Sequence, residues 1–435
     1  MNMLRTFNKT LLLCFFLVLS LSAYAQDGAY GAYTPYSIFG LGELHREGTA
    51  YNKSMGGVGI ATRNRRFINY MNPASITARD SLSFMADIGV AQKNSVYHQG
   101  NLKSGNNTFN VYDVILSFPI YRSSALMLGI TPFSDLGYDF TTKVTDPSII
   151  GNTGNISYKA SGDGSVYQLF AGAAATFWKR FSVGAEVIFY FGSLDKVFNQ
   201  TFSDASYNSV TSSDNLMIRS TTGKFGLQYE QSLGKGISMV LGATYRLRTG
   251  IHGRTVSSET LGSISDTLKY NDSNNAAVRM ADELGVGVSI RKGEKWSAEV
   301  NYVRSGWNKS GFENVDGFAV DADVKFTTTS THSFKAGFEI VPNRNDIRYY
   351  RKKIAYRAGV YYDQSYYKLD GNKVNSVGLT FGVTLPVYRL YNGITLGVDF
   401  GQKGSVKYNM VKERYVMFVL GFNIHDLWFH KTKYE

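Results

Sequence analysis

The sequence has a single cysteine, Cys14, and it lies within the first 25 residues. If that leader is removed, the remaining chain has no thiol, which excludes disulfides, thiolate metal sites and cysteine nucleophiles. No later stretch contains about 20 consecutive apolar residues, so membrane-spanning helices are also excluded. Only 7 prolines occur in 435 residues. Because proline cannot donate to a strand ladder, this scarcity leaves room for long strands.

The residue patterns of common active sites are missing as well. The six histidines are scattered, and the nearest pair, His425 and His430, has no third ligand close in sequence. There is no G-x-S-x-G elbow. The glycine pair Gly285 and Gly287 is not followed by a helical pattern, so it is not a nucleotide loop. We therefore predict no metal, no cofactor and no enzymatic activity.

Residues 1–25 have the order of charge, apolar core and small residues that is typical of a signal peptide. Arg5 and Lys9 precede an apolar run over residues 11–21, and Ala23 and Ala25 offer a cleavage site. A transmembrane anchor is the alternative, but the apolar run is too short to span a bilayer. We expect an exported protein that begins near Gln26.

The composition is rich in aromatic residues and glycine, with 30 Tyr, 28 Phe and 44 Gly. This content, with mild overall hydropathy, fits an outer-membrane barrel in which half of each strand faces water. The net charge is +12. We assign the basic excess to anionic outer-membrane lipids or an acidic partner. Nucleic acid is the alternative partner, but we expect none for an exported chain.

From Asp80 onward, apolar residues alternate strictly with other residues, as in a strand with two different faces. Charged residues fall on the face opposite the apolar one, among them Glu186, Arg246, Glu299 and Asp399, and Lys335, Glu339 and Arg357 follow the same rule. There are fourteen such runs, over residues 82–90, 112–120, 126–130, 167–177, 181–191, 225–229, 237–247, 284–290, 296–302, 334–340, 356–362, 377–385, 394–400 and 416–424.

A soluble β-sandwich would also alternate in this way. The connections decide between the two, because short ones (such as 178–180 and 234–236) alternate with long ones (such as 91–108 and 192–222). Outer-membrane barrels have this arrangement of tight periplasmic turns and long outer loops. We predict an all-β fold, a 14-stranded antiparallel transmembrane β-barrel over residues 80–425, in the outer membrane of a Gram-negative bacterium.

Residues 26–79 have no place in the barrel wall, because neither strand nor helix periodicity runs through them. Glycines in this segment allow close approach and positive φ, and Pro73 biases Asn72 to extended geometry. Simple turn chemistry is the alternative for these glycines. We predict that the segment is an N-terminal hatch, a plug folded inside the barrel lumen.

The hatch and barrel together resemble the FadL family of outer-membrane channels for long-chain fatty acids and aromatic hydrocarbons. The motif residues that carry the resemblance precede the first strand, and fourteen runs equals the strand number of that family. They are Ser37, Gly40, Gly42, Gly56, Gly57, Gly59, Asn72, Pro73 and Ala74. The resemblance implies a luminal hatch, a hydrophobic ligand pocket and sideways passage of ligand through the wall near the third strand.

Two features of the sequence are assigned to this expected function. A wall opening is predicted at Pro132, at the end of the third strand, since proline cannot donate to the ladder. The start of a loop is the alternative there. The hydrophobic ligand pocket is predicted between hatch and wall, lined by Ile38, Phe39, Leu41, Ile60 and Phe67.

A second hypothesis is a structural or accessory barrel that docks other envelope proteins without transporting. The longest loops are polar, as in residues 199–214 and 257–275, and a basic, aromatic periplasmic tail follows the last strand over residues 426–435. A solvated chain end is the alternative for the tail. Passive uptake of a hydrophobic small molecule remains the first hypothesis.

The barrel prediction requires that alternate side chains of residues 169–177 face lipid. Nitroxide labels at Leu169, Ala173 and Phe177 should therefore be relaxed by oxygen dissolved in the bilayer, since apolar oxygen concentrates there. Electron paramagnetic resonance of the protein in liposomes measures this. Labels insensitive to lipid-dissolved oxygen would indicate a soluble sandwich instead.

Overall fold

The computed structural model describes residues 33–79, 83–121, 123–144, 146–147, 150, 154–204, 206–262, 266–273, 278–315, 324–387 and 392–427. The predicted signal peptide, residues 1–25, lies outside these residues, as do residues 428–435 of the predicted tail. Within the described part of the chain, no helix is both long and apolar enough to cross a membrane.

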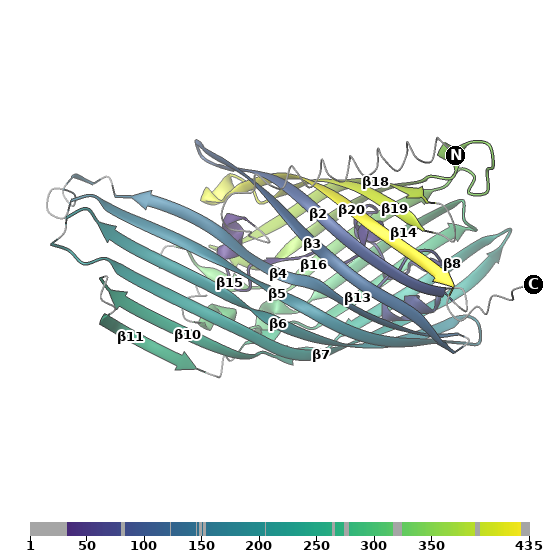
Figure 1. Ribbon diagram of the computed structural model, residues 1–435, viewed down its shortest axis with the longest axis horizontal. Coiled ribbons are helices and arrows are strands. Elements are labelled where there is room, and N and C mark those ends of the chain that lie inside the picture. Colours follow the sequence, from purple (N-terminus) through teal and green to yellow (C-terminus); the bar gives the residue numbers. More distant parts are fainter. Residues whose placement is uncertain are drawn as a thin grey trace, which may run out of the picture.

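Fourteen antiparallel strands form a closed ring, and each strand pairs with the next (Figure 1). The ring closes where Ser83 to His98 of the first wall strand pair with residues 412–427 of the last. This confirms the predicted fold class. The wall strands are β2 (Ser83–Gln99), β3 (Leu102–Tyr121), β4 (Ser124–Lys143), β5 (Ile156–Phe177), β6 (Phe181–Phe202), β7 (Val210–Gly234), β8 (Ile237–Arg246), β13 (Glu283–Lys292), β14 (Trp296–Ser305), β16 (Thr331–Ile340), β17 (Ala355–Leu369), β18 (Asn372–Pro386), β19 (Gly393–Lys403) and β20 (Lys412–Leu427).

Several connections predicted as long loops are strand extensions instead. The ladder between β2 and β3 continues to Gln99 and Leu102, so only Gly100 and Asn101 connect them. On the outer part of β7, the hairpin β10 (His252–Leu261) and β11 (Asp266–Ser273) adds further strands. Short strands β9 (Thr249–Gly250) and β12 (Arg279–Met280) pair with one another, and β15 (Phe326–Thr328) pairs with β17.

The two faces of the wall are separated as the alternation predicts. Leu169 is 48% exposed on the outer face of β5, whereas Gln168 beside it is 3% exposed. All seven charged residues that the sequence placed opposite the apolar face are buried in the structure, namely Glu186, Arg246, Glu299, Lys335, Glu339, Arg357 and Asp399. The outer face of the cylinder is thus apolar and the inner face is polar.

Residues 33–79 lie inside the ring, and the purple segments within the cylinder in Figure 1 belong to this part. Four short elements form here: η2 (Pro35–Ile38), β1 (Glu43–Leu44), α2 (Ala50–Lys53) and η3 (Pro73–Thr77). They contact strands on different sides of the ring, since η3 packs on β5, β6 and β7 while α2 packs on β19 and β20. Three more 3-10 turns lie in long-loop connections, η4 (Trp307–Lys309), η5 (Phe312–Asn314) and η7 (Lys407–Asn409), and η6 (Tyr350–Lys352) lies between β16 and β17.

Glycines on the inner face of the wall let the hatch approach the strand backbones. A Cβ atom at Gly242 of β8 would collide with the Ile60 carbonyl oxygen, and one at Gly359 of β17 with the Gly56 amide nitrogen. At Gly226 of β7 it would collide with the Asn72 side chain. These positions leave no room for even one methyl group, so the hatch and the wall fit one another closely.

The Gly242 contact predicts a substitution effect. Gly242→Ala should destabilise the folded barrel by about 1–3 kcal/mol, because the added methyl group meets backbone that cannot move aside. The temperature at which the barrel loses its fast-migrating form on SDS gels measures this. Gly250→Ala is the matched control, since a Cβ there meets nothing within 4 Å. Equal melting of the two variants would show that the Ile60 backbone does not press on β8.

Candidate functional site: a gap in the wall and a charged lumen

Strands β3 and β4 pair over only part of their length. Their ladder runs from Tyr121 and Ser124 to Val114 and Ile130, and beyond this point neither strand pairs with the other. Residues 102–113 of β3 remain on β2, and residues 131–143 of β4 remain on β5. Figure 1 shows the β2–β3 hairpin and β4 running apart toward the end with the long connections. The wall therefore contains a gap in this half of the barrel.

The β3–β4 ladder ends at Ile130, two residues before Pro132. The register of β4 against β5 shifts between Pro132 and Ser134, so Phe133 is the extra residue of a β-bulge, and bulges bend the strand that contains them. Every residue from Thr131 to Tyr138 is buried, whereas most other wall strands alternate between buried and more exposed residues. The strand does not end at Pro132, as the sequence led us to expect, but continues to Lys143.

The hatch covers the edge of β4 that faces the gap. Strand β1 pairs with β4, placing Glu43 opposite Asp135 and Leu44 opposite Ser134. On either side of this pair, the His45 amide donates to the Phe133 carbonyl over 2.9 Å and the Thr34 amide donates to the Gly137 carbonyl over 3.0 Å. The hatch thus takes the place that β3 leaves vacant on the β4 ladder.

Asp135 forms a polar link across the gap. Its side chain is 1% exposed, and it accepts a hydrogen bond of 3.0 Å from the Asn110 amide on β3. The His45 imidazole of the hatch lies 2.5 Å from the same carboxylate oxygen. Three segments, β3, β4 and the hatch, meet at one carboxylate.

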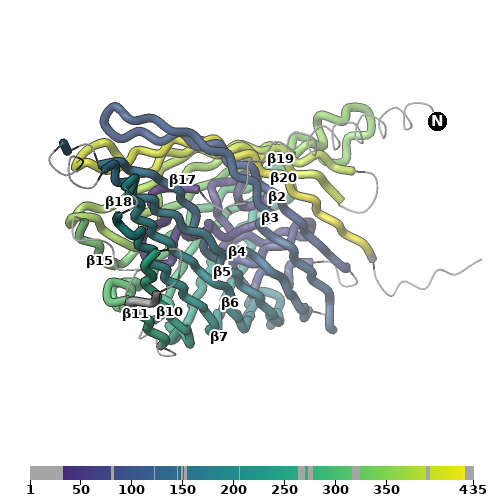
Figure 2. Tube along the Cα trace, turned by 60° about the vertical axis from the view of Figure 1, so that its left-hand side comes forward, coloured from purple at the N-terminus to yellow at the C-terminus, as the bar shows by residue number. Residues whose placement is uncertain are grey.

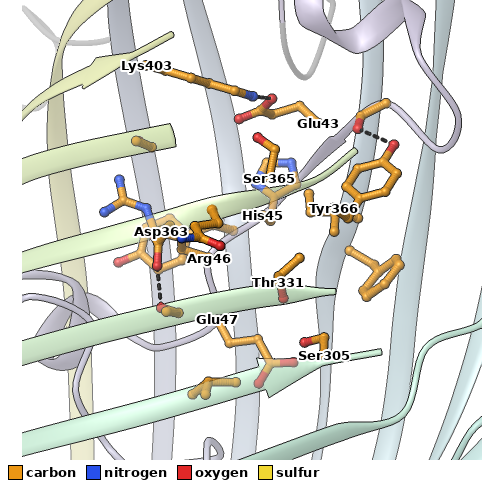
Figure 3. A pocket seen from close by; sticks show the side chains of 18 of the residues that line it. Glu43, His45, Arg46, Glu47, Ser305, Thr331, Asp363, Ser365, Tyr366 and Lys403 are labelled. Carbon is orange, nitrogen blue, oxygen red and sulfur yellow. Dashed lines mark hydrogen bonds and ion pairs between the residues drawn. The ribbon is translucent and has the colours of Figure 1, made fainter. Parts of the chain in front are cut away.

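A cavity of about 290 Å³ lies in the lumen beside the gap. Thr108, Asn110 and Tyr112 of β3 line it, together with Phe133 of β4, so it reaches both edges of the gap. Aromatic and aliphatic residues share its surface with charged ones. Figure 3 shows the charged hatch residues Glu43, His45, Arg46 and Glu47 close to Asp363 and Lys403 of the wall.

A buried ion-pair cluster joins the hatch to β7, β8 and β13. The Glu47 carboxylate lies 3.2 Å from the Lys224 ammonium and 3.0 Å from the Arg246 guanidinium. Lys224 also lies 3.5 Å from Glu186, and Arg246 lies 2.9 Å from Glu283. Burial alone raises the pKa of the Glu47 carboxyl, but Lys224 and Arg246 outweigh burial and lower that pKa to about 2.

Two further ion pairs fasten the hatch to β19. Glu43 pairs with Lys403, and Arg46 pairs with Asp399. The Arg46 guanidinium also lies 3.8 Å from the centre of the Tyr361 ring, a cation–π contact. Since β19 lies across the ring from β7 and β8, the hatch is fixed on two sides by charge.

Lys53 adds a cation to the cavity that can change its charge. Its ammonium donates to the Arg46 carbonyl over 2.6 Å and lies 4.8 Å from the centre of the Tyr112 ring. Burial, together with the Arg46 guanidinium, lowers the pKa of Lys53 to about 8. Asp113 of β3 is 1% exposed nearby, where a register shift at Gly89 and Val90 turns both Tyr112 and Asp113 inward.

The motif residues of the hatch are distributed over three contact areas. Ser37 lies at β4, where its hydroxyl donates to the Gly137 carbonyl over 2.9 Å. Gly42 has positive φ in the same area, and Gly40 has positive φ beside Tyr366 of β17 and Phe326 of β15. Gly56 and Gly57 have positive φ beside β16 and β17, and Gly59 lies against Met71 and Asn69. A Cβ at Gly42 would meet the Asp135 carbonyl oxygen.

Asn72, Pro73 and Ala74 form the start of η3. Asn72 has extended geometry, φ −127° and ψ 114°, as the following proline predicts. Its carboxamide oxygen accepts from the Ala74 amide over 3.0 Å, and its amide donates to the Ile60 carbonyl over 2.7 Å. The triplet therefore caps a short helix and ties it to the Ile60 segment.

The five residues predicted to line a ligand pocket do not lie together. Ile38, Phe39 and Leu41 belong to a large apolar cluster, in which the Phe39 ring stacks on Phe326 at 5.8 Å between centres. Ile60 lies against Gly285 and Gly287 of the wall, and Phe67 stacks on Tyr51 at 4.8 Å. None of the five lines the 290 Å³ cavity. Their role in ligand binding remains a prediction.

The sequence analysis overlooked the charged hatch residues between Glu43 and Glu47. Their signal was a dense run of charge, Glu43, His45, Arg46 and Glu47, inside an otherwise glycine-rich and apolar stretch. Such a run needs partners when it is buried. Among the described residues, no group of three or more histidine, aspartate, glutamate or cysteine side chains is placed to hold a metal ion.

Known structures share this architecture. A Pseudomonas aeruginosa FadL homologue matches with a TM-score of 0.59 at 12% identity, over 89% of this chain and 100% of that one. The Pseudomonas putida toluene transporter TodX matches with a TM-score of 0.57 at 16% identity, over 89% and 99%. The Ralstonia pickettii toluene transporter TbuX matches with a TM-score of 0.53 at 13% identity, over 87% and 98%.

The chain thus has the fold of FadL-type channels, which confirms the resemblance read from the sequence. Two of these similar structures are toluene transporters, and the third is a FadL homologue. A family model described as BamG matches residues 7–435. The chain belongs to the BamG family. No curated protein matches the chain.

The Glu47 cluster predicts a dependence on pH. A carboxyl whose pKa falls from about 4.5 to about 2 on folding contributes about 3 kcal/mol to the free energy of unfolding. This contribution is fully present above pH 4.5 and is lost as the pH falls from 4.5 to 2. Glu47→Gln should remove this contribution and flatten stability over that window. Melting of the barrel on SDS gels, as a function of pH, measures both effects. Glu259→Gln, on the outer hairpin, should keep the wild-type profile; a Glu47→Gln profile identical to wild type would contradict the assignment.

Proposed function

We propose that this barrel is an outer-membrane channel for passive uptake of hydrophobic small molecules, of the fatty-acid or aromatic-hydrocarbon type. The observation that carries the proposal is the gap between β3 and β4, beyond Val114 and Ile130. The luminal cavity reaches the same place, so a ligand in it lies beside a break in the wall. The toluene transporters TodX and TbuX have the same fold, which supports this reading.

The cavity chemistry favours a ligand with one polar end. Tyr112, Phe133 and Trp307 offer apolar surface, while Lys53 and Lys335 offer positive charge. Four carboxylates, those of Glu43, Glu47, Glu283 and Asp363, line the same cavity, so its lining is apolar in part and charged in part. A fatty acid, with an apolar chain and one anionic end, matches both parts of this lining, whereas toluene matches only the apolar part.

Passage through the gap predicts that bridging its edges blocks uptake. The chain has no cysteine beyond Cys14, so Asn110→Cys with Asp135→Cys introduces a unique pair, which a short bis-methanethiosulfonate reagent can join. Uptake of a radiolabelled fatty acid and of labelled toluene is measured in cells that carry only this variant. The uptake rate should fall about tenfold when the pair is linked, which corresponds to about 1.4 kcal/mol in barrier height. Reduction of the link should restore the rate.

The matched control is Ser157→Cys with Thr201→Cys, which pairs two residues across the intact ladder of β5 and β6. Linking this pair should leave uptake unchanged. If deletion of the gene alters uptake of neither compound, the channel proposal is wrong. If both linked pairs reduce uptake equally, the route does not run through the gap.

A second candidate function is that of an accessory barrel that docks partner proteins of an envelope assembly. It is favoured by the way the hatch is fastened, with ion pairs to β7, β8 and β19 and close contacts to wall glycines. Such a plug costs much to displace. A discrete complex with other envelope proteins in mild detergent is expected on this hypothesis, whereas a solitary barrel on size-exclusion chromatography would oppose it.

A further inference from the structure

A second cavity, of about 260 Å³, lies at the end of the barrel with the short turns. We name it the arginine mouth, because five arginines line it. Arg63, Arg65 and Arg66 come from the hatch, Arg291 from β13, and Arg344 from the connection between β16 and β17. This end faces the periplasm in outer-membrane barrels.

The carboxylates of the arginine mouth are already engaged. Glu299 accepts hydrogen bonds from the Thr62 hydroxyl and the Ala61 amide, and Glu339 accepts one of 2.7 Å from Arg357. Glu294 lies 2.9 Å from Arg66 and 3.5 Å from Arg344, so one carboxylate serves two guanidinium groups. Five arginines and three glutamates line the arginine mouth, and Glu230 beside it pairs with both Arg63 and Arg291. These five arginines and four glutamates leave one positive charge in excess, and two carboxylates, Glu230 and Glu294, are each shared by two guanidinium groups.

The connection that contributes Arg344, residues 341–353, forms a folded projection beside the arginine mouth. Asp346 organises it, since its carboxylate accepts from the amides of Arg348 over 2.9 Å and Tyr349 over 2.7 Å. At the turn, Ile347 is 98% exposed and Tyr350 is 54% exposed. In Figure 2 this connection, coloured lime green, stands out beyond the ends of the strands.

The rest of the short-turn end is basic too. Its described connections carry far more lysine and arginine than aspartate and glutamate. The cations are Lys179, Arg180, Lys235, Lys295, Arg344, Arg348, Arg351, Lys352 and Lys353, and the acids are Glu294 and Asp346. A partner that approaches from this side meets a positive field, which favours acidic partners and speeds their association.

We propose that the arginine mouth and the 341–353 connection together dock an acidic segment of a periplasmic protein. Guanidinium groups bind carboxylates through paired hydrogen bonds, and the cavity has room for only a few side chains. Bilayer lipid is disfavoured as the occupant, because Arg63, Arg65 and Arg66 stand inside the ring of strands. A small free anion leaves Ile347 and Tyr350 unused, whereas protein interfaces bury such residues beside arginine.

This inference goes beyond the channel proposal and does not depend on it. The gap between β3 and β4 and the 290 Å³ cavity lie in the other half of the barrel, and the arginine mouth shares no lining residue with that cavity. Variants of the arginine mouth should therefore leave uptake of hydrophobic compounds at the wild-type rate.

The test uses the full-length protein in a neutral detergent and fluorescein-labelled hexaglutamate as the probe, with binding followed by fluorescence anisotropy. Arg65→Gln with Arg344→Gln should weaken binding by about tenfold or more. Lys179→Gln with Arg180→Gln is the matched control, because it removes the same charge from another short turn and should change the affinity less than about twofold. Retention of the fast-migrating form on SDS gels shows that each variant is folded.

Three outcomes overturn the proposal. If the two variants lose affinity equally, the probe binds by non-specific electrostatic attraction and the proposed site is wrong. If the wild type shows no measurable binding, the proposed site is also wrong. Dihexanoyl phosphatidylglycerol and inorganic phosphate are tested as competitors of the probe. If either one displaces the probe at concentrations at which it saturates the wild type but does not bind Arg65→Gln with Arg344→Gln, the site belongs to lipid or to a free anion. Addition of Ile347→Asp should weaken binding of a glutamate peptide that ends in leucine, and no change there would reject the role of the projection.

Discussion

The architecture depends on charge compensation between the hatch and the inner face of the wall. A barrel of this size turns lysine, arginine and glutamate side chains into its lumen, where isolated charges are costly. Glu47 lies between Lys224 and Arg246, and Arg46 lies against Asp399. Residues 43–47 thus supply counter-charges to wall residues on two sides of the lumen.

The strands could be predicted from sequence because a membrane wall imposes two incompatible solvents on alternate residues. Leu169 and Gln168 differ in exposure for that reason alone, and all fourteen runs correspond to wall strands. The outer extensions escaped prediction because water surrounds both of their faces. Residues 102–110 of β3, for example, include Lys103, Ser104 and Asn106, and no apolar period marks them as a strand.

The candidate site could be predicted only where the covalent structure of a single residue restricts the backbone, as it does at proline. Pro132 cannot donate to a ladder, and the pairing of β3 with β4 ends at Ile130, two residues before it. Asp135, Asn110 and His45 meet because of long-range pairing between β1 and β4, which no local pattern reveals. The apolar hatch residues were grouped by composition, yet Phe39 and Phe67 pack into different clusters. The sequence showed which residue types the hatch contains, but not which part of the wall each side chain packs against.

The contacts that hold the hatch differ in kind from one side of the barrel to the other. At Gly242 and Gly359 the hatch touches backbone, so it cannot slide there without separating strands. At β4 the hatch is held by exchangeable hydrogen bonds, through β1 and the Asp135 carboxylate. Such bonds contribute about 0.5–1.5 kcal/mol each, far less than expelling the whole plug would cost. Residues 33–45 also contribute Phe39 and Leu41 to the large apolar cluster and Glu43 to the ion pair with Lys403, so packing and charge hold this part of the hatch as well.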